Sequence, residues 1–273
     1  MQKGNSNTVR PHTVKKFELI ENYVKQWAPK LLNYDRCDGV VFIDCMCNSG
    51  IYYDDTGKEV FGTPIRIARV LSDLMLKYPQ KKAFLYFNDL SSEKIDILKE
   101  YLPTNTPNYH ISTSNEDGNS FIKKIAMQDL GRVNYLLFYD PNNASLDWNA
   151  LKLYFGKWGE IITNHMVCDS KRGLTQATRP PATSRYQKTY QYEDLNDILK
   201  HSSNLEHSSN QEVYMKRVRE IIDTLLSETN KQYHVASFPF FNMRNALLYE
   251  LIYCTRNIKG FRLFKKTAWK VFG

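Results

Sequence analysis

The stretch Val40 to Gly50, VVFIDCMCNSG, decides the fold class of this chain. The β-branched and aromatic residues from Val40 to Ile43 predict a fully buried strand, and Asp44 stands at its end. The small residues at 48 to 50 allow the backbone to turn sharply and to approach a ligand closely. Open α/β sheets bind nucleotides and adenosyl compounds where a buried strand leads into such a turn. We therefore predict a ligand site at this strand end.

The composition is that of one large globular domain. The chain has 273 residues, of which 42% are hydrophobic, enough to bury a sizeable core. It shows no N-terminal apolar signal and no apolar run of about 18 residues, so we expect a cytoplasmic protein that does not enter a membrane. Its five cysteines form an odd set without CxxC spacing, which predicts neither a disulfide framework nor a zinc ribbon.

The order of apolar segments predicts an α/β domain with a mostly parallel sheet and helices on both faces. We expect a mobile arm and a helix over 1–39, a ligand-binding half over 40–168, a loop and helical insertion over 169–231, and C-terminal strands and a helix over 232–273. The two late strands, 232–238 and 246–254, predict an antiparallel edge. Further strands are expected at 83–88, 109–113, 133–139 and 160–167, helices at 13–31 with a kink or end at Pro29, 91–101, 118–128, 147–155, 192–200 and 211–228, and a long inserted loop at 169–191.

Three predicted strands end in an acidic residue: Asp44, Asp89 and Asp140. Because equivalent ends of parallel strands share one edge of a sheet, these carboxylates are expected at the crevice where such sheets bind ligands. An acid after the second strand can accept hydrogen bonds from ribose hydroxyls, although Asp89 could instead cap the helix that follows. The chain has neither a full GxGxxG pattern nor a GxxxxGK[ST] loop, which favours a cofactor without a polyphosphate. Its scattered histidines indicate no metal site.

Several segments, in this order, resemble those of class I S-adenosylmethionine methyltransferases, and more closely the three-Cys-motif partner family, TcmP. The resemblance covers most of the chain and implies a Rossmann-like class I methyltransferase fold. Its parts are HTVKKFELIENYVKQW at 12–27, FIDCMCNSG at 42–50, FGTP at 61–64, FND at 87–89, LLFYDP at 136–141, NHMVCDSKRG at 164–173 and LYELIYCTRNIKGFRLFKKTAW at 248–269.

The resemblance implies S-adenosylmethionine as the cofactor and assigns roles to residues around it. The turn from Asp44 to Gly50 would lie under the cofactor's amino-acid part and ribose, and Asp89 would take the ribose hydroxyls. Asn115 and Glu116 would flank the adenine.

The turn departs from the family at two positions. Where the family usually reads Asp-x-x-Ala-Gly-x-Gly, this chain has Cys47 and Asn48 in place of Ala and the first Gly. Asn is the residue other than glycine that best tolerates a positive φ, so we expect the turn to be kept with altered contacts.

Asp140-Pro141-Asn142-Asn143 is comparable to the DPPY-type motif of amino-methyltransferases, but it lacks the motif's aromatic residue. The resemblance implies that Asp140 faces the methyl-transfer centre, where it is the candidate base for the proton of the nucleophile. A strand end followed by an Asx-type turn is an alternative explanation of the same four residues. Candidate substrate-binding residues are Asn142, Lys171 and Arg172.

Basic and aromatic residues of the loop and of the C-terminus predict a nucleic-acid partner, since cations meet phosphates and rings stack on bases. Solvated charge beside a core of aromatic residues is the alternative. Three functions remain open: a methyltransferase acting on nucleic acid, a non-catalytic partner of a nucleic acid or of a protein that carries a cysteine motif, and a metal-dependent nuclease using Asp44, Asp89 and Asp140.

Overall fold

The computed structural model describes residues 8–141, 143, 145–169, 182–192, 210–242 and 246–272. The chain forms two compact units. The first comprises Met1–Phe138, Trp158–Glu160 and Asn257–Gly273, and the second comprises Tyr139–Lys157 and Ile161–Arg256. Among the described residues, no helix combines the length and the apolar character needed to span a membrane.

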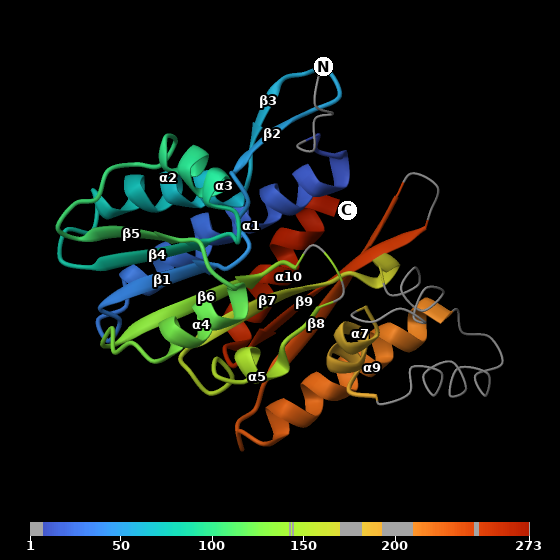
Figure 1. Ribbon diagram of the computed structural model, residues 1–273. Coiled ribbons are helices and arrows are strands. Elements are labelled where there is room, and N and C mark those ends of the chain that lie inside the picture. Colours follow the sequence, from blue (N-terminus) through green and yellow to red (C-terminus); the bar gives the residue numbers. More distant parts are fainter. Residues whose placement is uncertain are drawn as a thin grey trace. The chain divides into compact units, whose positions relative to one another are not determined.

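In the described part of the chain, the central sheet has seven strands in the order β5-β4-β1-β6-β7-β9-β8 (Figure 1). Strand β1 pairs in parallel with both β4 and β6, β4 pairs in parallel with β5, and β8 pairs with β9 in the antiparallel sense. The predicted Rossmann-like α/β fold, a mostly parallel sheet with an antiparallel C-terminal edge, is therefore confirmed. The strands are β1 Gly39–Asp44, β4 Lys82–Asn88, β5 Tyr109–Ser114, β6 Val133–Tyr139, β7 Gly159–His165, β8 His234–Phe241 and β9 Leu247–Thr255.

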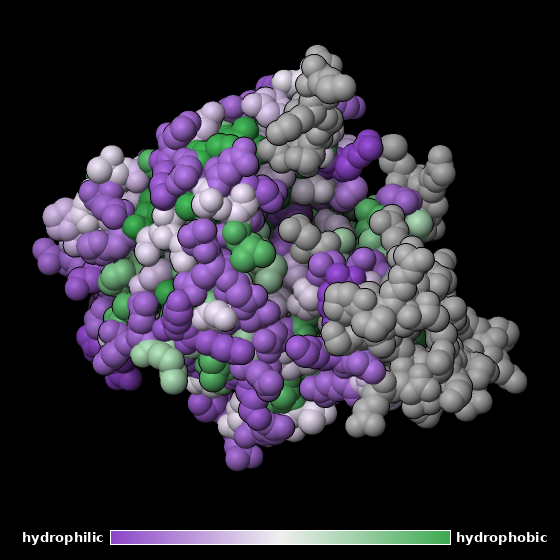
Figure 2. Space-filling view, in the orientation of Figure 1, coloured by the Kyte–Doolittle hydropathy of each residue, from purple (hydrophilic) through white to green (hydrophobic). Residues whose placement is uncertain are grey.

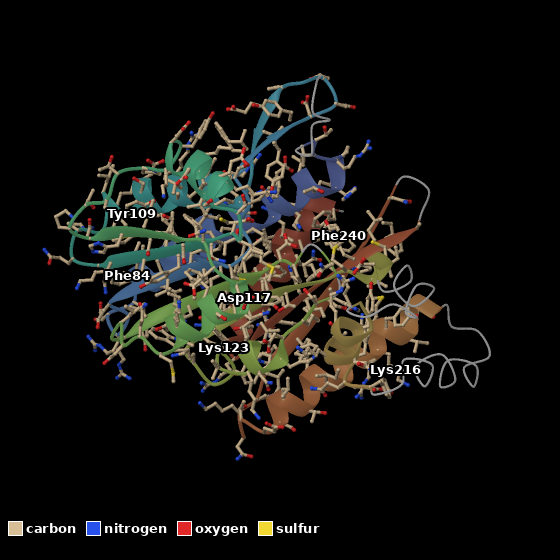
Figure 3. The ribbon with its side chains drawn as sticks, in the orientation of Figure 1. Phe84, Tyr109, Asp117, Lys123, Lys216 and Phe240 are labelled. Carbon is tan, nitrogen blue, oxygen red and sulfur yellow. The ribbon has the colours of Figure 1, made fainter. Side chains whose placement is uncertain are left out.

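Helices cover both faces of the sheet in the first unit. Tyr109, labelled in Figure 3, lies beside Ala83, and its hydroxyl donates to the Ala68 carbonyl of α2 at 2.7 Å. Tyr86, three residues beyond Ala83, points to the opposite face, where its hydroxyl donates to Gln128 just after α4 at 2.8 Å. The predicted helical cover is thus found here. The helices of this unit are α1 Pro11–Leu32, α2 Thr63–Met75, α3 Ser92–Lys99, α4 Gly118–Ala126 and α10 Ile258–Phe272.

Helix α1 is the predicted N-terminal helix, and it continues through Pro29 to Leu32. It packs against α10, where the rings of Tyr23 and Phe264 meet edge to face with centroids 4.9 Å apart. The buried Tyr23 hydroxyl also donates to the carboxylate of Glu160 at the start of β7. These contacts hold α1 against α10 and against the start of β7 in the first unit.

A small hairpin follows the turn after β1. Its strands, β2 Ile51–Tyr53 and β3 Glu59–Phe61, pair in the antiparallel sense. Helix α2 then begins after Gly62 with Pro64 in its first turn, where a proline costs no hydrogen bond. The face drawn in Figure 2 is mainly hydrophilic over the described residues, with smaller apolar groups between them.

Two predictions fail in the second unit. The helix expected at 147–155 is the single turn α5, Trp148–Leu151, and residues 182–190 of the expected loop form a helix, α7, Ala182–Tyr190. Thr189 explains the second error, because its hydroxyl accepts the N–H of Leu146 at 3.0 Å and its carbonyl accepts the indole N–H of Trp148 at 2.8 Å. Such tertiary contacts stabilise a helix whose sequence is too polar to predict it. Residues 170–181 lie outside the described residues, as does the helix expected over 192–200 from residue 193 on, whereas α9, Asn210–Ser227, matches its prediction.

The packing of α1 on α10 predicts a large stability difference between two aromatic positions of α10. Replacing the fully buried Phe264 by Ala should lower the free energy of unfolding by about 3–5 kcal/mol, because it leaves a cavity beside Tyr23. Trp269 is 79% exposed, so Trp269→Ala should change it by less than about 0.5 kcal/mol. Urea unfolding monitored by circular dichroism checks both, and equal midpoints for the two variants would contradict this packing.

Candidate functional site

The turn after β1 is built from two residues with left-handed backbone conformation. Asn48 has φ 58° and Gly50 has φ 70°. The side-chain oxygen of Asn48 accepts the N–H of Ser49 at 2.8 Å, a local bond that helps Asn hold this conformation. The expectation that Asn48 tolerates a positive φ at the position of the missing glycine is confirmed.

Gly50 is required for both conformation and space. A Cβ at this position would come within 3.0 Å of the side chains of Ile65 and Leu98. The Gly50 carbonyl also accepts the N–H of Gly62 at 2.7 Å, which ties the turn to the residue that precedes α2. The turn therefore lies close against the helices of the first unit.

Asn88, the last residue of β4, joins the loops that follow three strands. Its side-chain N–H groups donate to the carbonyls of Cys45 and Glu116, each at 3.0 Å, and its side-chain oxygen accepts the N–H of Glu116 at 3.0 Å. Its backbone carbonyl accepts the N–H of Cys47 at 2.8 Å. This role of Asn88 was not predicted from the sequence, although an Asn at the end of an otherwise apolar strand is a visible signal.

Asp89 points toward the turn. One of its carboxylate oxygens accepts the N–H of Asn48 at 3.0 Å, and the other accepts the N–H of Ser91 at 3.0 Å and lies 3.9 Å from the ammonium of Lys94. The cap of α3 is Ser91, whose hydroxyl accepts the N–H of Lys94, so Asp89 is not the capping residue. Each carboxylate oxygen can accept more than one hydrogen bond, which leaves capacity for a ligand hydroxyl.

The loop after β5 carries Asn115 and Glu116. Asn115 is exposed, and Glu116 is partly buried. Glu116 accepts hydrogen bonds from Lys124 and, at 2.9 Å, from the Ser114 hydroxyl, and the Lys124 ammonium lowers the pKa of Glu116. Figure 3 labels Asp117, the capping residue of α4, next to this loop along the chain. The first unit thus brings together the ends of β1, β4 and β5, with all the residues predicted to bind a cofactor: Asp44, Cys47, Asn48, Gly50, Asp89, Asn115 and Glu116.

Cys47 lies buried between the acids of this site. Burial raises the pKa of its thiol well above its ordinary value, and the carboxylates of Asp44 and Asp89 add to the shift. The thiol is therefore protonated at neutral pH, so it contributes packing and no nucleophile. All five cysteines of the chain are free.

Asp140, which follows β6, belongs to the second unit. Its Oδ1 accepts a hydrogen bond of 2.5 Å from the side chain of Asn164, whose own oxygen has no hydrogen-bond partner among the described residues. Burial, with a contribution from Asp140, raises the pKa of Tyr249, and the Tyr249 ring stacks on Phe240 with centroids 4.4 Å apart (Figure 3 labels Phe240). Asn142, Lys171 and Arg172, the predicted substrate-binding residues, lie outside the described residues.

The second unit also contains a buried polar cluster that was not predicted from the sequence. His165 and Glu250 are both fully buried, with the His165 Nδ1 3.6 Å from a Glu250 oxygen and the His165 Nε2 2.9 Å from the Tyr190 hydroxyl. Burial alone would raise the pKa of Glu250, but hydrogen bonds from His165 and Arg219 outweigh it and hold that pKa below its usual value. The cluster joins β7, β9, α7 and α9.

Comparisons with known proteins support the fold. No family model matches the chain, and no curated protein does. The solved structure of protein LPL1258 from Legionella pneumophila, described as family-model DUF519, is similar to this chain. The TM-score is 0.53 at 11% identity, over 96% of this chain and 94% of that one. This chain has the same overall fold.

Two weaker likenesses are to methyltransferases. An O-methyltransferase from Bacillus cereus, solved in complex with SAH, has a TM-score of 0.41 at 11% identity over 92% of this chain and 83% of that one. The methyltransferase domain of bacterial CtHen1-C has a TM-score of 0.41 at 10% identity over 89% of this chain and 98% of that one.

Among the described residues, no group of three or more His, Cys, Asp or Glu side chains could hold a metal ion.

The backbone of Asn48 predicts how the turn responds to substitution. Asn48→Gly should keep the stability of the protein, because glycine adopts a positive φ without strain. Asn48→Val should lower the free energy of unfolding by about 1–2 kcal/mol, because a β-branched residue is strained there. Chemical denaturation of both variants tests the turn, and a Val variant as stable as the Gly variant would refute its conformation.

Burial of the thiols predicts a graded cysteine reactivity. In the native protein at pH 8, Ellman's reagent should react fast with Cys168, which is partly exposed, and slowly with the other four cysteines, which are buried. Cys168→Ser should remove the fast phase. A fast phase that survives in Cys168→Ser would contradict the burial of the other four cysteines.

Burial of the thiols also predicts how stability depends on pH. Because the folded state raises the pKa of Cys47 and Cys254, the unfolded state loses these protons first, and the free energy of unfolding should fall as the pH rises above about 9.

Proposed function

We propose that the chain binds S-adenosylmethionine at the turn after β1 and is a TcmP-type methyltransferase that acts on nucleic acid. The observation that carries the proposal is the contact between Asn48 and Asp89. A left-handed Asn in place of glycine keeps the turn open, and its N–H donates to the acid expected to hold the ribose hydroxyls.

The charge of the site supports a cationic adenosyl ligand over a nucleotide. Asp44 is 2% exposed and Asp89 is 8% exposed, and both add to the effect of burial in raising the pKa of the Cys47 thiol. Buried carboxylates disfavour a polyphosphate and favour the sulfonium and amino groups of S-adenosylmethionine. Leu90, directly after Asp89, is 76% exposed and offers an apolar surface on which adenine could pack.

The proposed catalytic residue is Asp140. The cofactor would supply an activated methyl group, and the chain has to align the acceptor and to take up its proton. The short hydrogen bond from Asn164 fixes the orientation of the Asp140 carboxylate. Nucleic acid is the preferred acceptor because the chain carries a formal charge of +8.

Isothermal titration tests the cofactor. S-adenosylmethionine and its demethylated product should bind the wild-type chain, and Asp89→Asn should weaken both about 10- to 100-fold, since hydrogen bonds to a charged group are lost. Asp96→Asn is the matched control, because it removes the same charge from an exposed position of α3. The absence of binding heat at about millimolar ligand would refute cofactor binding.

A methyl-transfer assay separates an active enzyme from a non-catalytic partner protein. Labelled S-adenosylmethionine is supplied with single-stranded DNA, RNA or protein, and transfer to a nucleic acid is expected. Asp140→Ala should abolish transfer and leave cofactor affinity unchanged. Cofactor binding without transfer to any acceptor would instead favour the non-catalytic function.

A further inference from the structure

Helix α10 has an unusual charge composition. Between Ile258 and Phe272 it contains five Lys or Arg residues and no Asp or Glu. Its buried positions, Gly260, Phe264, Thr267 and Ala268, face the first unit, where the side chain of Gln26 donates to the Thr267 hydroxyl at 3.2 Å. The charge therefore belongs to the opposite, exposed face.

The exposed face forms a continuous basic stripe. With about 100° of rotation per residue, four cations and one indole fall within an arc of about 100°, on the side of the helix opposite the buried positions. From its first to its last cation the stripe is about 16 Å long, at about 1.5 Å per residue. Its members are Lys259, Arg262, Lys266, Trp269 and Lys270.

The basic stripe lacks internal charge compensation. None of its four cations forms an ion pair with an acid in the described part of the chain, whereas Arg132 elsewhere on the surface pairs with Asp38 at 2.7 Å. Trp269 is 79% exposed, which is unusual for so large an apolar ring. Unpaired cations around an exposed ring are the combination that binds phosphates and stacks on bases.

The stripe ends near the turn after β1. The Lys15 ammonium of α1 lies 5.8 Å from the ring centroid of Phe272 in the last turn of α10. Two residues along α1, the ring of Phe17 lies 5.1 Å from that of Tyr52 in β2, which directly follows the turn. Figure 1 shows the C-terminus beside the start of α1. The C-terminal end of the stripe and the proposed cofactor site therefore lie at the same end of the first unit.

We propose that the basic stripe of α10 is the docking surface for a single strand of nucleic acid. The cations would meet successive phosphates, and Trp269 would stack on an unpaired base. An anionic membrane fits less well, because a helix that lies on a membrane inserts its apolar face, and that face of α10 is buried against α1. The proposal rests on the nucleic-acid preference of the proposed function and adds the surface that recognises the acceptor.

Fluorescence anisotropy with labelled single strands of DNA and of RNA tests the stripe. The variant K259Q/R262Q/K266Q/K270Q should weaken binding about tenfold or more and lower the slope of log affinity against log salt by about 3, since each lost phosphate contact contributes about 0.7 for single strands. Trp269→Ala should weaken single strands about fivefold or more and duplexes less, and Trp269→Phe should restore most of the loss.

The matched control is K30Q/K58Q/K77Q/K82Q, which removes four exposed lysines outside α10 and the same charge. It should leave the affinity within about threefold of the wild type. Equal loss in the control, no loss in the stripe variant, or binding to phosphatidylserine vesicles but not to nucleic acid would each overturn the proposal. Titration of the stripe variant with S-adenosylmethionine keeps the outcomes apart, because cofactor binding should persist when docking is lost.

Discussion

The site depends on the hydrogen bonds that the buried side chain of Asn88 forms. Parallel strands fix where β1, β4 and β5 end, but not the shape of the loops beyond them. One amide group supplies that shape, because it bonds to Cys45 on one side and twice to Glu116 on the other. Removing it would leave buried backbone groups unpaired, each at a cost of about 1–3 kcal/mol.

Charge is arranged differently at the two proposed binding surfaces of the first unit. The turn after β1 carries buried acids, which add to the effect of burial in raising the pKa of Cys47. Helix α10 carries exposed cations on the side that faces away from α1. Buried acids act at short range on one ligand, whereas exposed cations act on a polymer through many screened contacts. The net charge of the chain reveals only the exposed cations.

The sequence predicted what depends on local periodicity and missed what depends on tertiary contacts. The strands, the antiparallel C-terminal edge and the turn could be predicted because apolar runs and turn residues mark them directly. Helix α7 could not, since Thr189 and Tyr190 are held by partners such as Trp148 and Tyr214 that are distant in sequence. The pairing of His165 with Glu250 was hidden for the same reason, because the two residues are far apart in the sequence.

The left-handed conformation of Asn48 has a consequence for how such chains are recognised. A glycine-rich signature records letters, whereas the backbone requires only a residue that accepts a positive φ. A chain that meets the requirement with Asn passes unnoticed in any search for the glycine pattern. Families that bind the same ligand are therefore better delimited by the torsion angles of their turns than by the residue types in their sequence motifs.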